Sequence, residues 1–424
     1  MKQHLTVAVI GAGNRGETYT DIMAAMPDKF KVVAVAEPIE SRRKNIQAKH
    51  NIPDELCFKY DHELLAAGKL ADVAIISTMD QQHFEPAMKA ISLGYDILLE
   101  KPVSPDPKEC EMIAQHAAKN GVRIVVCHVL RYTPFFITLK QLIQEGKIGE
   151  VVSINHEECV GNVHQSHSFV RGNWGNQERA SCMLLQKSCH DMDILQWLLD
   201  KKCEKIQSFG SLTHFRKENA PEGSPERCID GCPHGETCPY NAIKLYLDDK
   251  KNDWFRSTCA RIPNPTDDDI VKALRTTQYG KCVYKCDNDV VDHQTVNMLF
   301  EDGITVTFSM NAFNRGGRHI HIMGTKGEIH GNMRADEKPI QLFDFETRQT
   351  YDIELRTGDD ISSGHGGGDE GIIHSIYDYF NGDDTNISVS DIRTSVDNHL
   401  IVFAAEKARS EMSVVDLETY KRGL

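Results

Sequence analysis

A glycine-rich stretch near the N-terminus has the residue types and spacing of a phosphate-binding turn. It reads Gly-Ala-Gly-Asn-Arg-Gly, begins at Gly11 directly after an apolar run, and matches the pattern G-x-G-x-x-G. In this pattern Gly11 permits a tight turn, Gly13 lets backbone amides approach a pyrophosphate, and Gly16 lets a helix pack closely on a strand. Asn14 and Arg15 complete this turn and are predicted to contact the cofactor, and the N-terminus of the helix that follows would face the phosphates.

An acidic residue follows at the distance that a dinucleotide-binding fold requires. The apolar run 31–36 ends at Glu37, twenty-one residues beyond Gly16. In such folds a carboxylate at this place accepts hydrogen bonds from the hydroxyls of the adenosine ribose. Because it would also repel a 2′-phosphate, the pattern predicts NAD as the cofactor, although Arg42 and Arg43 leave some room for NADP.

A lysine at the end of a predicted strand could exchange a proton with a substrate. The strand predicted over 95–99 leads into Glu100, Lys101 and Pro102. This places Lys101 at the carboxyl edge of the sheet, where ligands bind in open α/β sheets. A buried lysine has a lowered pKa, so Lys101 could hydrogen-bond a hydroxyl and exchange its proton. The alternative is a salt bridge to Glu100 at a strand end.

Alternating strands and helices must position these groups. The pattern continues for about 127 residues and predicts one doubly wound α/β domain over 1–127. Its predicted strands are 5–10, 31–36, 71–78, 95–99 and 122–127. Its predicted helices are 17–26, 41–50, a stretch after His83 that runs through Ile91, and 107–120.

The remaining chain has a different organisation. Strands follow one another with short turns, such as Asp302-Gly303, which predicts a second, α+β domain over 128–424 with an open, largely antiparallel sheet. The predicted strands are 149–156, 205–215, 291–300, 304–311 and 319–324, and the predicted helices are 134–145, 186–199 and 389–409. A cysteine-rich insertion occupies about 220–290.

This order of motifs resembles the Gfo/Idh/MocA family of NAD(P)-dependent sugar and cyclitol oxidoreductases. The shared features are the glycine turn, His83 after the third strand, Glu-Lys-Pro ending the fourth strand, His190 followed by Asp193, and the Gly-rich stretch from Gly364. The resemblance implies a Rossmann domain and hydride transfer between nicotinamide and a ring carbon of a sugar, glycoside or cyclitol. Some members are instead redox-neutral NAD-dependent glycoside hydrolases, which oxidise a hydroxyl transiently, eliminate the aglycone and add water.

The resemblance makes His190 a second acid or base beside Lys101. Family members commonly carry an aspartate four residues before this histidine, where the chain has Gln186, which cannot supply a carboxylate. Lys187 lies three residues before His190 and so on the same helical face, where it adds a cation. That cation would suit the enolate of a hydrolase, and a solvated lysine is the alternative.

Further binding residues are predicted from the resemblance or from residue type. Cofactor contacts extend to Thr78, His83, Glu100 and Lys101, with an ordinary loop histidine as the alternative for His83. The predicted substrate-binding residues are Arg131, Tyr132, Trp174, Asp191 and His365.

Thirteen cysteines occur in a chain that resembles a cytosolic enzyme, so we expect them to be reduced. Cys228, Cys232 and Cys238 could hold a structural zinc ion, but their spacing is not a standard one. Reduced cysteines packed in a loop-rich insertion, without a metal, are the preferred interpretation.

Composition limits the partners of the protein. A net charge of −14 over 424 residues disfavours nucleic acid and anionic membranes, which attract basic surfaces. No apolar run approaches eighteen residues, and the N-terminus leads directly into the first predicted strand. We therefore expect a cytoplasmic enzyme with a small-molecule substrate, and a homo-oligomer because an open sheet face often pairs with a second subunit.

Overall fold

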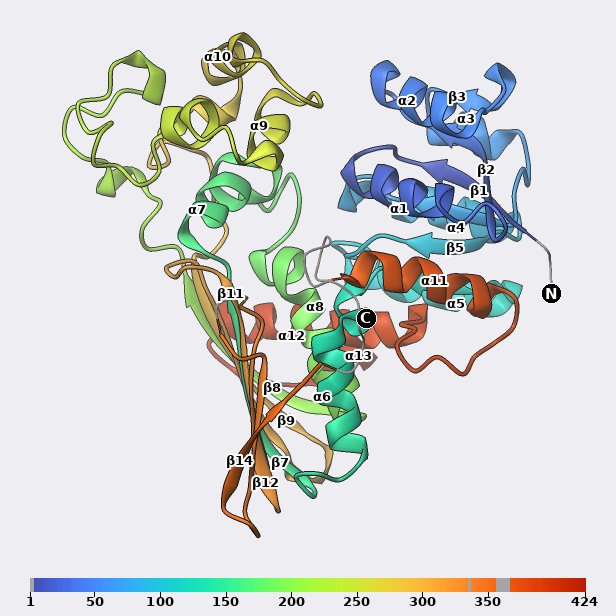
Figure 1. Ribbon diagram of the computed structural model, residues 1–424, viewed down its shortest axis with the longest axis vertical. Helices are drawn as coiled ribbons and strands as arrows, with labels where there is room; N and C mark the ends of the chain where they lie inside the picture. The colour runs from blue at the N-terminus through green and yellow to red at the C-terminus, as the bar shows by residue number, and fades with distance from the viewer. Residues whose placement is uncertain (1–3, 335–336, 356–366) are drawn as a thin grey trace.

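The computed structural model describes residues 4–334, 337–355 and 367–424, in which two sheets lie side by side (Figure 1). Within these residues, the first sheet has six parallel strands in the order β3-β2-β1-β4-β5-β6. Its strands are β1 (Leu5–Ile10), β2 (Phe30–Ala36), β3 (Cys57–Phe58), β4 (Val73–Ile76), β5 (Asp96–Leu99) and β6 (Ile124–Val126). The helices between them are α1 (Asn14–Ala24), α2 (Glu40–His50), α3 (Asp61–Ala66), α4 (Phe84–Ser92) and α5 (Pro107–Asn120).

The second sheet is mixed and largely antiparallel. In the described part of the chain it has nine strands in the order β14-β13-β12-β11-β7-β10-β9-β8-β15, and only the β7–β10 pair is parallel. The strands are β7 (Val151–Cys159), β8 (Cys203–Ser211), β9 (His293–Phe300), β10 (Thr305–Asn311), β11 (Gly317–Gly324), β12 (Gly327–Asn332), β13 (Ile340–Asp344), β14 (Gln349–Ile353) and β15 (Val414–Asp416). The remaining helices are α6 (Pro134–Gln144), α7 (Asn162–His164), α8 (Met183–Leu199), α9 (Asp253–Ala260), α10 (Asp267–Thr276), α11 (Gly368–Phe380), α12 (Ile392–Glu411) and α13 (Leu417–Arg422).

These two sheets confirm the predicted fold class. The first strand and helix α5 have the predicted bounds, and the turn at Asp302-Gly303 joins antiparallel strands, with positive φ angles at both residues. Other strands are shorter than predicted: β4 begins at Val73 rather than at residue 71, and β6 begins at Ile124 rather than at residue 122. The division at residues 127 and 128 stays a prediction.

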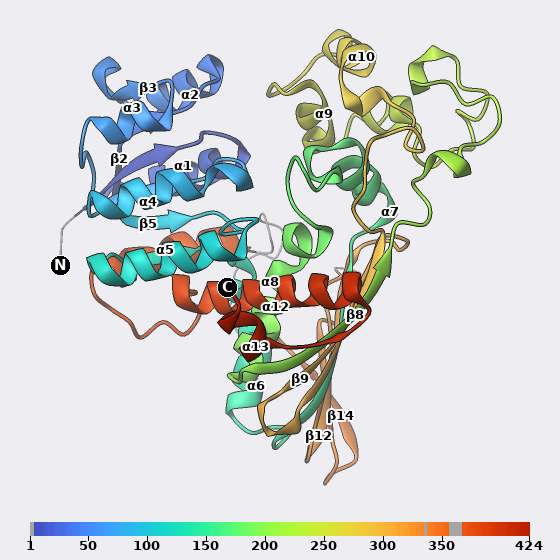
Figure 2. The ribbon, with the colours of Figure 1, turned by 180° about the vertical axis from the view of Figure 1, so that it is seen from behind.

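Helices from the C-terminal end of the chain complete the core of the first sheet. Residues Ile372 and Ile376 of α11 pack in one core cluster with Val7 and Val9 of β1. On the other face, the start of α12 packs with α4, α5 and the strands through residues such as Val396. The two opposite views show α11 in front of the first sheet in Figure 1 and α5 in front of it in Figure 2, with α12 below both.

One face of the second sheet is covered and the other is open. Helices α6, α8 and α12 pack on the covered face, where Ile154, Val306 and Ile320 point into the core. Alternate residues point the other way, as at Asn155 and Thr307, so this face carries polar side chains. Because α8 lies between the two sheets, its side chains can meet the carboxyl ends of the parallel strands (Figure 1).

The insertion forms a loop-rich lobe above α7 (Figure 1). It has a small core of its own, in which Tyr246, Phe255 and Leu274 pack together. Among the described helices, none is both long and apolar enough to cross a membrane.

Candidate active site

The glycine turn has the geometry that its sequence predicts. Gly11 has a φ of +91°, and a Cβ at this position would lie 2.7 Å from the carbonyl oxygen of Ser77. A Cβ on Gly16 would lie 2.2 Å from the carbonyl oxygen of Gly11. A Cβ on Gly13 would meet only Nη1 of Arg42, at 3.8 Å. The space before the N-terminus of α1 is therefore open, as a bound pyrophosphate requires.

The Glu37 carboxylate lies buried beside this turn, just past the end of β2. Its Oε2 accepts a hydrogen bond from the Ala12 amide at 2.7 Å, and its Oε1 accepts one from the Ile39 amide at 2.9 Å. A carboxylate offers about four acceptor positions, so the positions not used by these two amides can accept hydrogen bonds from ribose hydroxyls. The Arg43 guanidinium donates to the backbone carbonyl of Glu37, which holds it near the same corner.

Arg15 and Glu100 are joined in an ion-pair network that links the two ends of the chain. Arg15 Nε lies 2.9 Å from Glu100 Oε1, and Arg15 Nη2 lies 2.6 Å from Asp369 Oδ1 on α11. The Tyr19 hydroxyl donates to Glu100 Oε1 at 2.5 Å. Burial works to raise the pKa of Glu100, but the charges of Arg15 and Lys101 outweigh it and hold that pKa below its ordinary value. Both side chains fix α1 against β5 and α11, and their predicted cofactor contacts stay predictions.

His83 ties together the two loops that follow β4 and β5. Its fully buried ring lies between two backbone carbonyl oxygens, with Nδ1 2.8 Å from that of Pro102 and Nε2 3.2 Å from that of Thr78. The ring thus positions the loop that carries Thr78 and the segment after Lys101. Its predicted contact with the cofactor stays a prediction.

Lys101 reaches across from the first sheet to helix α8. Its Nζ donates a hydrogen bond to the backbone carbonyl of Gln186 at 2.9 Å. Glu100 instead accepts a hydrogen bond from the Lys101 backbone amide at 3.0 Å. The ammonium group is therefore held at the junction of the two sheets, one helical turn before His190.

A carboxylate missed by the sequence analysis lies beside Gln186. The Gln186 side-chain amide donates to the Asp80 carboxylate and, at 2.8 Å, to the hydroxyl of Ser181. Asp80 is buried in the loop after β4, so the first domain supplies an acid next to the position where the family commonly has its aspartate. Its place two residues beyond Thr78, past a strand end, is the signal that could have marked it.

His190 lies on α8 next to a second buried histidine. The ring of His128, which follows β6, packs edge-on against the ring of His190 with centroids 5.6 Å apart. Burial lowers the pKa of His128 to about 4, although Asp193 opposes this effect. His128 is therefore neutral at physiological pH. His190 as a whole residue is 8% exposed, so a small part of it remains accessible to a ligand at this junction.

Arg131 and Asp193 form a buried ion pair below His190. The Arg131 guanidinium donates to both carboxylate oxygens of Asp193, at 2.6 and 2.7 Å. Asn398 and Ser390 also donate to this carboxylate. The pair joins the loop after β6 to α8 and α12. Substrate binding by Arg131 stays a prediction, and the contacts of Asp193 are structural ones.

Lys187 and Asp191 belong to a second charged network on α8. Lys187 Nζ lies 3.4 Å from Glu158 Oε1, and Glu158 also pairs with Arg318. Asp191 Oδ1 lies 2.8 Å from both Arg318 Nε and His156 Nε2. Burial lowers the pKa of Lys187, and Glu158 opposes this shift. Because its side chain is 20% exposed, Lys187 can reach a ligand, whereas Asp191 is enclosed.

The other predicted substrate residues lie in different surroundings. Tyr132 is buried against Gly371 of α11, and burial raises its pKa well above the ordinary value. Trp174 is partly buried, with its ring 6.3 Å from that of Phe169. His365 lies outside the described residues.

The three cysteines considered as candidate zinc ligands all line one pocket in the insertion. Cys228, Cys232 and Cys238 surround it together with Cys282, and we call these four residues the cysteine pocket. Arg171 Nη2 donates to the sulfur of Cys228 at 3.7 Å. Within the described residues, no three of these sulfur atoms lie within 4.8 Å of one another. Zinc binding here is therefore not demonstrated by the geometry.

Comparison with known proteins agrees with this arrangement. A model of the GFO_IDH_MocA oxidoreductase family, described as its NAD-binding Rossmann fold, matches residues 5–128. The model of the family's C-terminal alpha/beta domain matches residues 140–417.

Individual relatives are distant in sequence. YteT of Bacillus subtilis is 24% identical over 379 residues, which cover 84% of this chain and 81% of YteT. Inositol 2-dehydrogenase 1 of Saccharopolyspora erythraea is 24% identical over 202 residues, or 47% of this chain and 56% of the relative.

Solved structures share the fold over almost the whole chain. An oxidoreductase from Agrobacterium radiobacter, in complex with NAD⁺, L-tartaric acid and magnesium, has a TM-score of 0.69 at 14% identity and covers 98% of this chain and 99% of its own. Scyllo-inositol dehydrogenase from Lactobacillus casei has a TM-score of 0.64 at 15% identity, with 99% and 100% covered. Both family models together span most of the sequence, and the chain therefore belongs to the Gfo/Idh/MocA family of oxidoreductases.

Proposed function

We propose that the protein transfers a hydride between NAD and a ring carbon of a cyclitol, sugar or glycoside. This carbon carries a hydroxyl group in the reduced substrate and is a ketone carbon in the oxidised one. The observation that carries this proposal is the position of the Lys101 ammonium, which reaches from the end of β5 to the backbone of α8. It brings a proton-exchanging group to the junction where the helix also presents His190. The inositol dehydrogenases among the relatives favour a cyclitol over other polyols.

The residues of the chain would bind and orient the reactants. When bound, NAD supplies the hydride acceptor. The open space at Gly13 fits its pyrophosphate, and the remaining acceptor positions of Glu37 fit the ribose hydroxyls. The Lys101 ammonium would donate a hydrogen bond to the reacting oxygen, and His190, in its neutral form, would take up the proton of the hydroxyl.

NAD is proposed over NADP because of charge. A 2′-phosphate would lie against the buried Glu37 carboxylate, and two adjacent negative charges repel each other. Arg43 uses one guanidinium nitrogen on the backbone carbonyl of Glu37, which limits its reach toward a phosphate.

A substrate panel tests the proposal directly. The purified protein would be given NAD with inositol isomers, free sugars and aryl glycosides, and both NADH absorbance and aglycone release would be followed. Absorbance without release is the expected result. Release of aglycone without net NADH would contradict net oxidation, and neither signal with any member of the panel would contradict the proposed substrate class.

The redox-neutral glycoside hydrolase remains a second candidate because of Lys187. Burial lowers the pKa of this lysine, which suits proton exchange at the carbon beside a transient ketone. Exchange of solvent deuterium into recovered glycoside would favour this candidate over the dehydrogenase. Location in the cytoplasm and assembly into a homo-oligomer stay predictions.

A further inference from the structure

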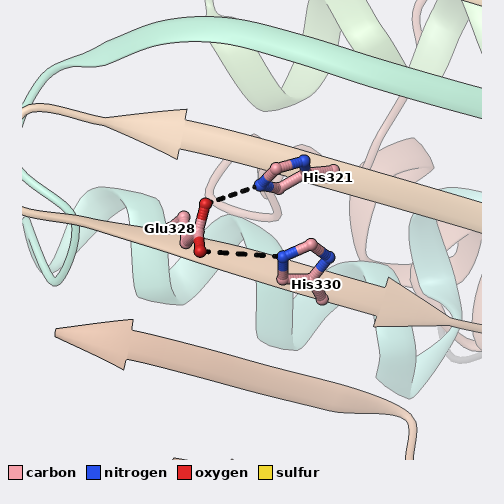
Figure 3. Close-up of side chains that lie close together, drawn as sticks. All are labelled: His321, Glu328 and His330. Carbon is pink, nitrogen blue, oxygen red and sulfur yellow. Dashed lines mark hydrogen bonds and ion pairs between the residues drawn. The ribbon is translucent and has the colours of Figure 1, made fainter. Parts of the chain in front are cut away.

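Three side chains that commonly bind metals converge on the open face of the second sheet. His321 lies on β11, and Glu328 and His330 lie on β12 (Figure 3). His321 and His330 face each other directly in the antiparallel register. Glu328 precedes His330 by two residues and therefore points to the same side of the sheet. All three side chains come from one two-stranded unit of the second sheet, whereas Lys101 follows β5 of the first sheet.

The donor atoms are already close together. Nε2 of His321 lies 2.9 Å from one carboxylate oxygen of Glu328, and Nε2 of His330 lies 3.8 Å from the other. One donor atom from each side chain lies within 4.8 Å of the other two, and across the described residues this is the only such group of three. The two imidazole rings stack with centroids 3.9 Å apart. Figure 3 shows the carboxylate directed at both rings.

This donor set selects a class of cation. Two imidazole nitrogens and one carboxylate oxygen suit zinc and the other late first-row divalent ions, whereas calcium and magnesium prefer oxygen ligands alone. In a tetrahedral zinc site with bonds of about 2.0–2.2 Å, donor atoms are about 3.4 Å apart. Closing the cluster around one ion thus needs side-chain shifts on the order of 1 Å. The partly exposed side chains can make them.

We propose that His321, Glu328 and His330 bind one divalent cation of the zinc class, with water in the remaining coordination position. The strand register supports this site, because Ile320 and Ile322 point from β11 into the core, and a slip by one residue would bury the histidine. Ligands on paired strands are held more precisely than ligands on loops.

The surroundings leave room for the open coordination position. His321 and His330 line a surface hollow of about 600 Å³, most of whose other lining side chains are polar. Asn155 and Gln341 flank the two histidines on the neighbouring strands. Helix α8 packs on the opposite face of the sheet, so this site is separate from the proposed hydride-transfer site. Its test does not depend on the proposed function.

Metal titration of the full-length protein tests the site. After removal of bound metal with a chelator, Co²⁺ alone and Zn²⁺ alone would be titrated into the parent protein, His330→Gln and Glu328→Gln. His319→Gln is the matched control, because His319 lies on the same face of β11, two residues before His321, and outside the cluster. We expect the parent and the control to bind one equivalent that both cluster variants lose.

Spectroscopy separates this site from the cysteine pocket. Cobalt bound by imidazole and carboxylate gives only weak visible bands, whereas thiolate ligands add intense sulfur-to-metal absorption. We expect the affinity for the metal ion that shows no sulfur absorption to fall in the cluster variants. The loss should exceed the roughly 10–100-fold that follows when a residue that only hydrogen-bonds a metal ligand is removed. Zinc should also raise the Tm of the parent and the control but not that of His330→Gln.

The outcomes are decisive because the substituted side chains lie at the surface. His330 is 57% exposed, so His330→Gln should fold, and circular dichroism of the metal-free variants would verify this. Equal stoichiometry and affinity in parent and His330→Gln would overturn the proposal. So would a parent protein whose bound cobalt shows sulfur ligation alone.

Discussion

Replacing Lys101 by methionine should separate catalysis from cofactor binding. The variant keeps the apolar stem of the side chain but removes the ammonium that donates to Gln186. If that ammonium manages the hydroxyl proton, turnover should fall by about 10²–10⁴-fold, the range for a positioned acid or base. This corresponds to about 2.7–5.4 kcal/mol in the activation barrier.

Loss of stability cannot produce so large an effect. The variant loses one hydrogen bond from a charged donor, which contributes about 1–2 kcal/mol at a partly buried site. A protein with an unfolding free energy of at least about 5 kcal/mol would still be more than about 99% folded. Unfolding would then lower turnover by only about 1%.

Lys140 provides a matched control. It is a buried lysine whose Nζ donates to the backbone carbonyl of Trp197 at 2.6 Å, at the other end of the same helix α8. Lys140→Met should lower stability by a similar amount without a comparable loss of turnover. The assay measures kcat and KM by NADH absorbance, NAD affinity by calorimetry and unfolding by denaturant. Turnover of Lys101→Met close to that of the parent, or equal losses in both variants, would refute the catalytic role of Lys101.

Four further predictions concern the cofactor, the fold and the insertion. Glu37→Ala should reduce the preference for NAD over NADP in calorimetric titrations, and an unchanged preference would show that Glu37 does not select the cofactor. Gly16→Ala should abolish or strongly weaken NAD binding, because the added Cβ would lie 2.2 Å from the carbonyl oxygen of Gly11; tight binding would contradict the close approach. Burial lowers the pKa of His128 to about 4 and that of His399 to about 3, so on unfolding these residues take up protons below pH 6.5. The free energy of unfolding should therefore fall from pH 7 to pH 5 by about 2 kcal/mol for each of these histidines. Denaturant unfolding of a variant that lacks both histidines tests this, and a pH dependence equal to that of the parent would contradict the assignment. Elemental analysis of His330→Gln, in which the proposed histidine site is removed, tests the cysteine pocket. A zinc content below about 0.2 equivalents would support reduced cysteines without a metal.

The sequence was most informative where function depends on adjacent residues. The glycine turn and the strand that ends at Lys101 each occupy one short segment, so their residue types and order predict their geometry. The strands of the first sheet are buried on both faces, so each of them appears in the sequence as a continuous apolar run. In contrast, strands β12, β13 and β14 were not predicted, because they lie at the edge of the second sheet and carry many polar or exposed residues.

Contacts between distant residues could not be predicted from one sequence. The pairing of Gln186 with Asp80 joins residues 106 positions apart, and nothing in either local pattern indicates the partner. The type of a polar residue does not reveal its hydrogen-bond partner either. Arg131 was selected as a group that suits hydroxyls, yet its guanidinium is occupied by Asp193. Only the packing of α8 and α12 reveals which polar side chains remain accessible.

The proposed site depends on two contacts that cross between distant parts of the chain. Lys101 joins the first sheet to α8, and Arg15 joins the glycine-turn helix to Asp369 on α11. Glu100 accepts hydrogen bonds from Arg15 and from the Lys101 backbone amide, so it connects the two contacts. A shift of α1 would therefore reach, through this buried carboxylate, the lysine that contacts α8. This connection gives a physical reason why cofactor binding and substrate positioning should be coupled in this protein.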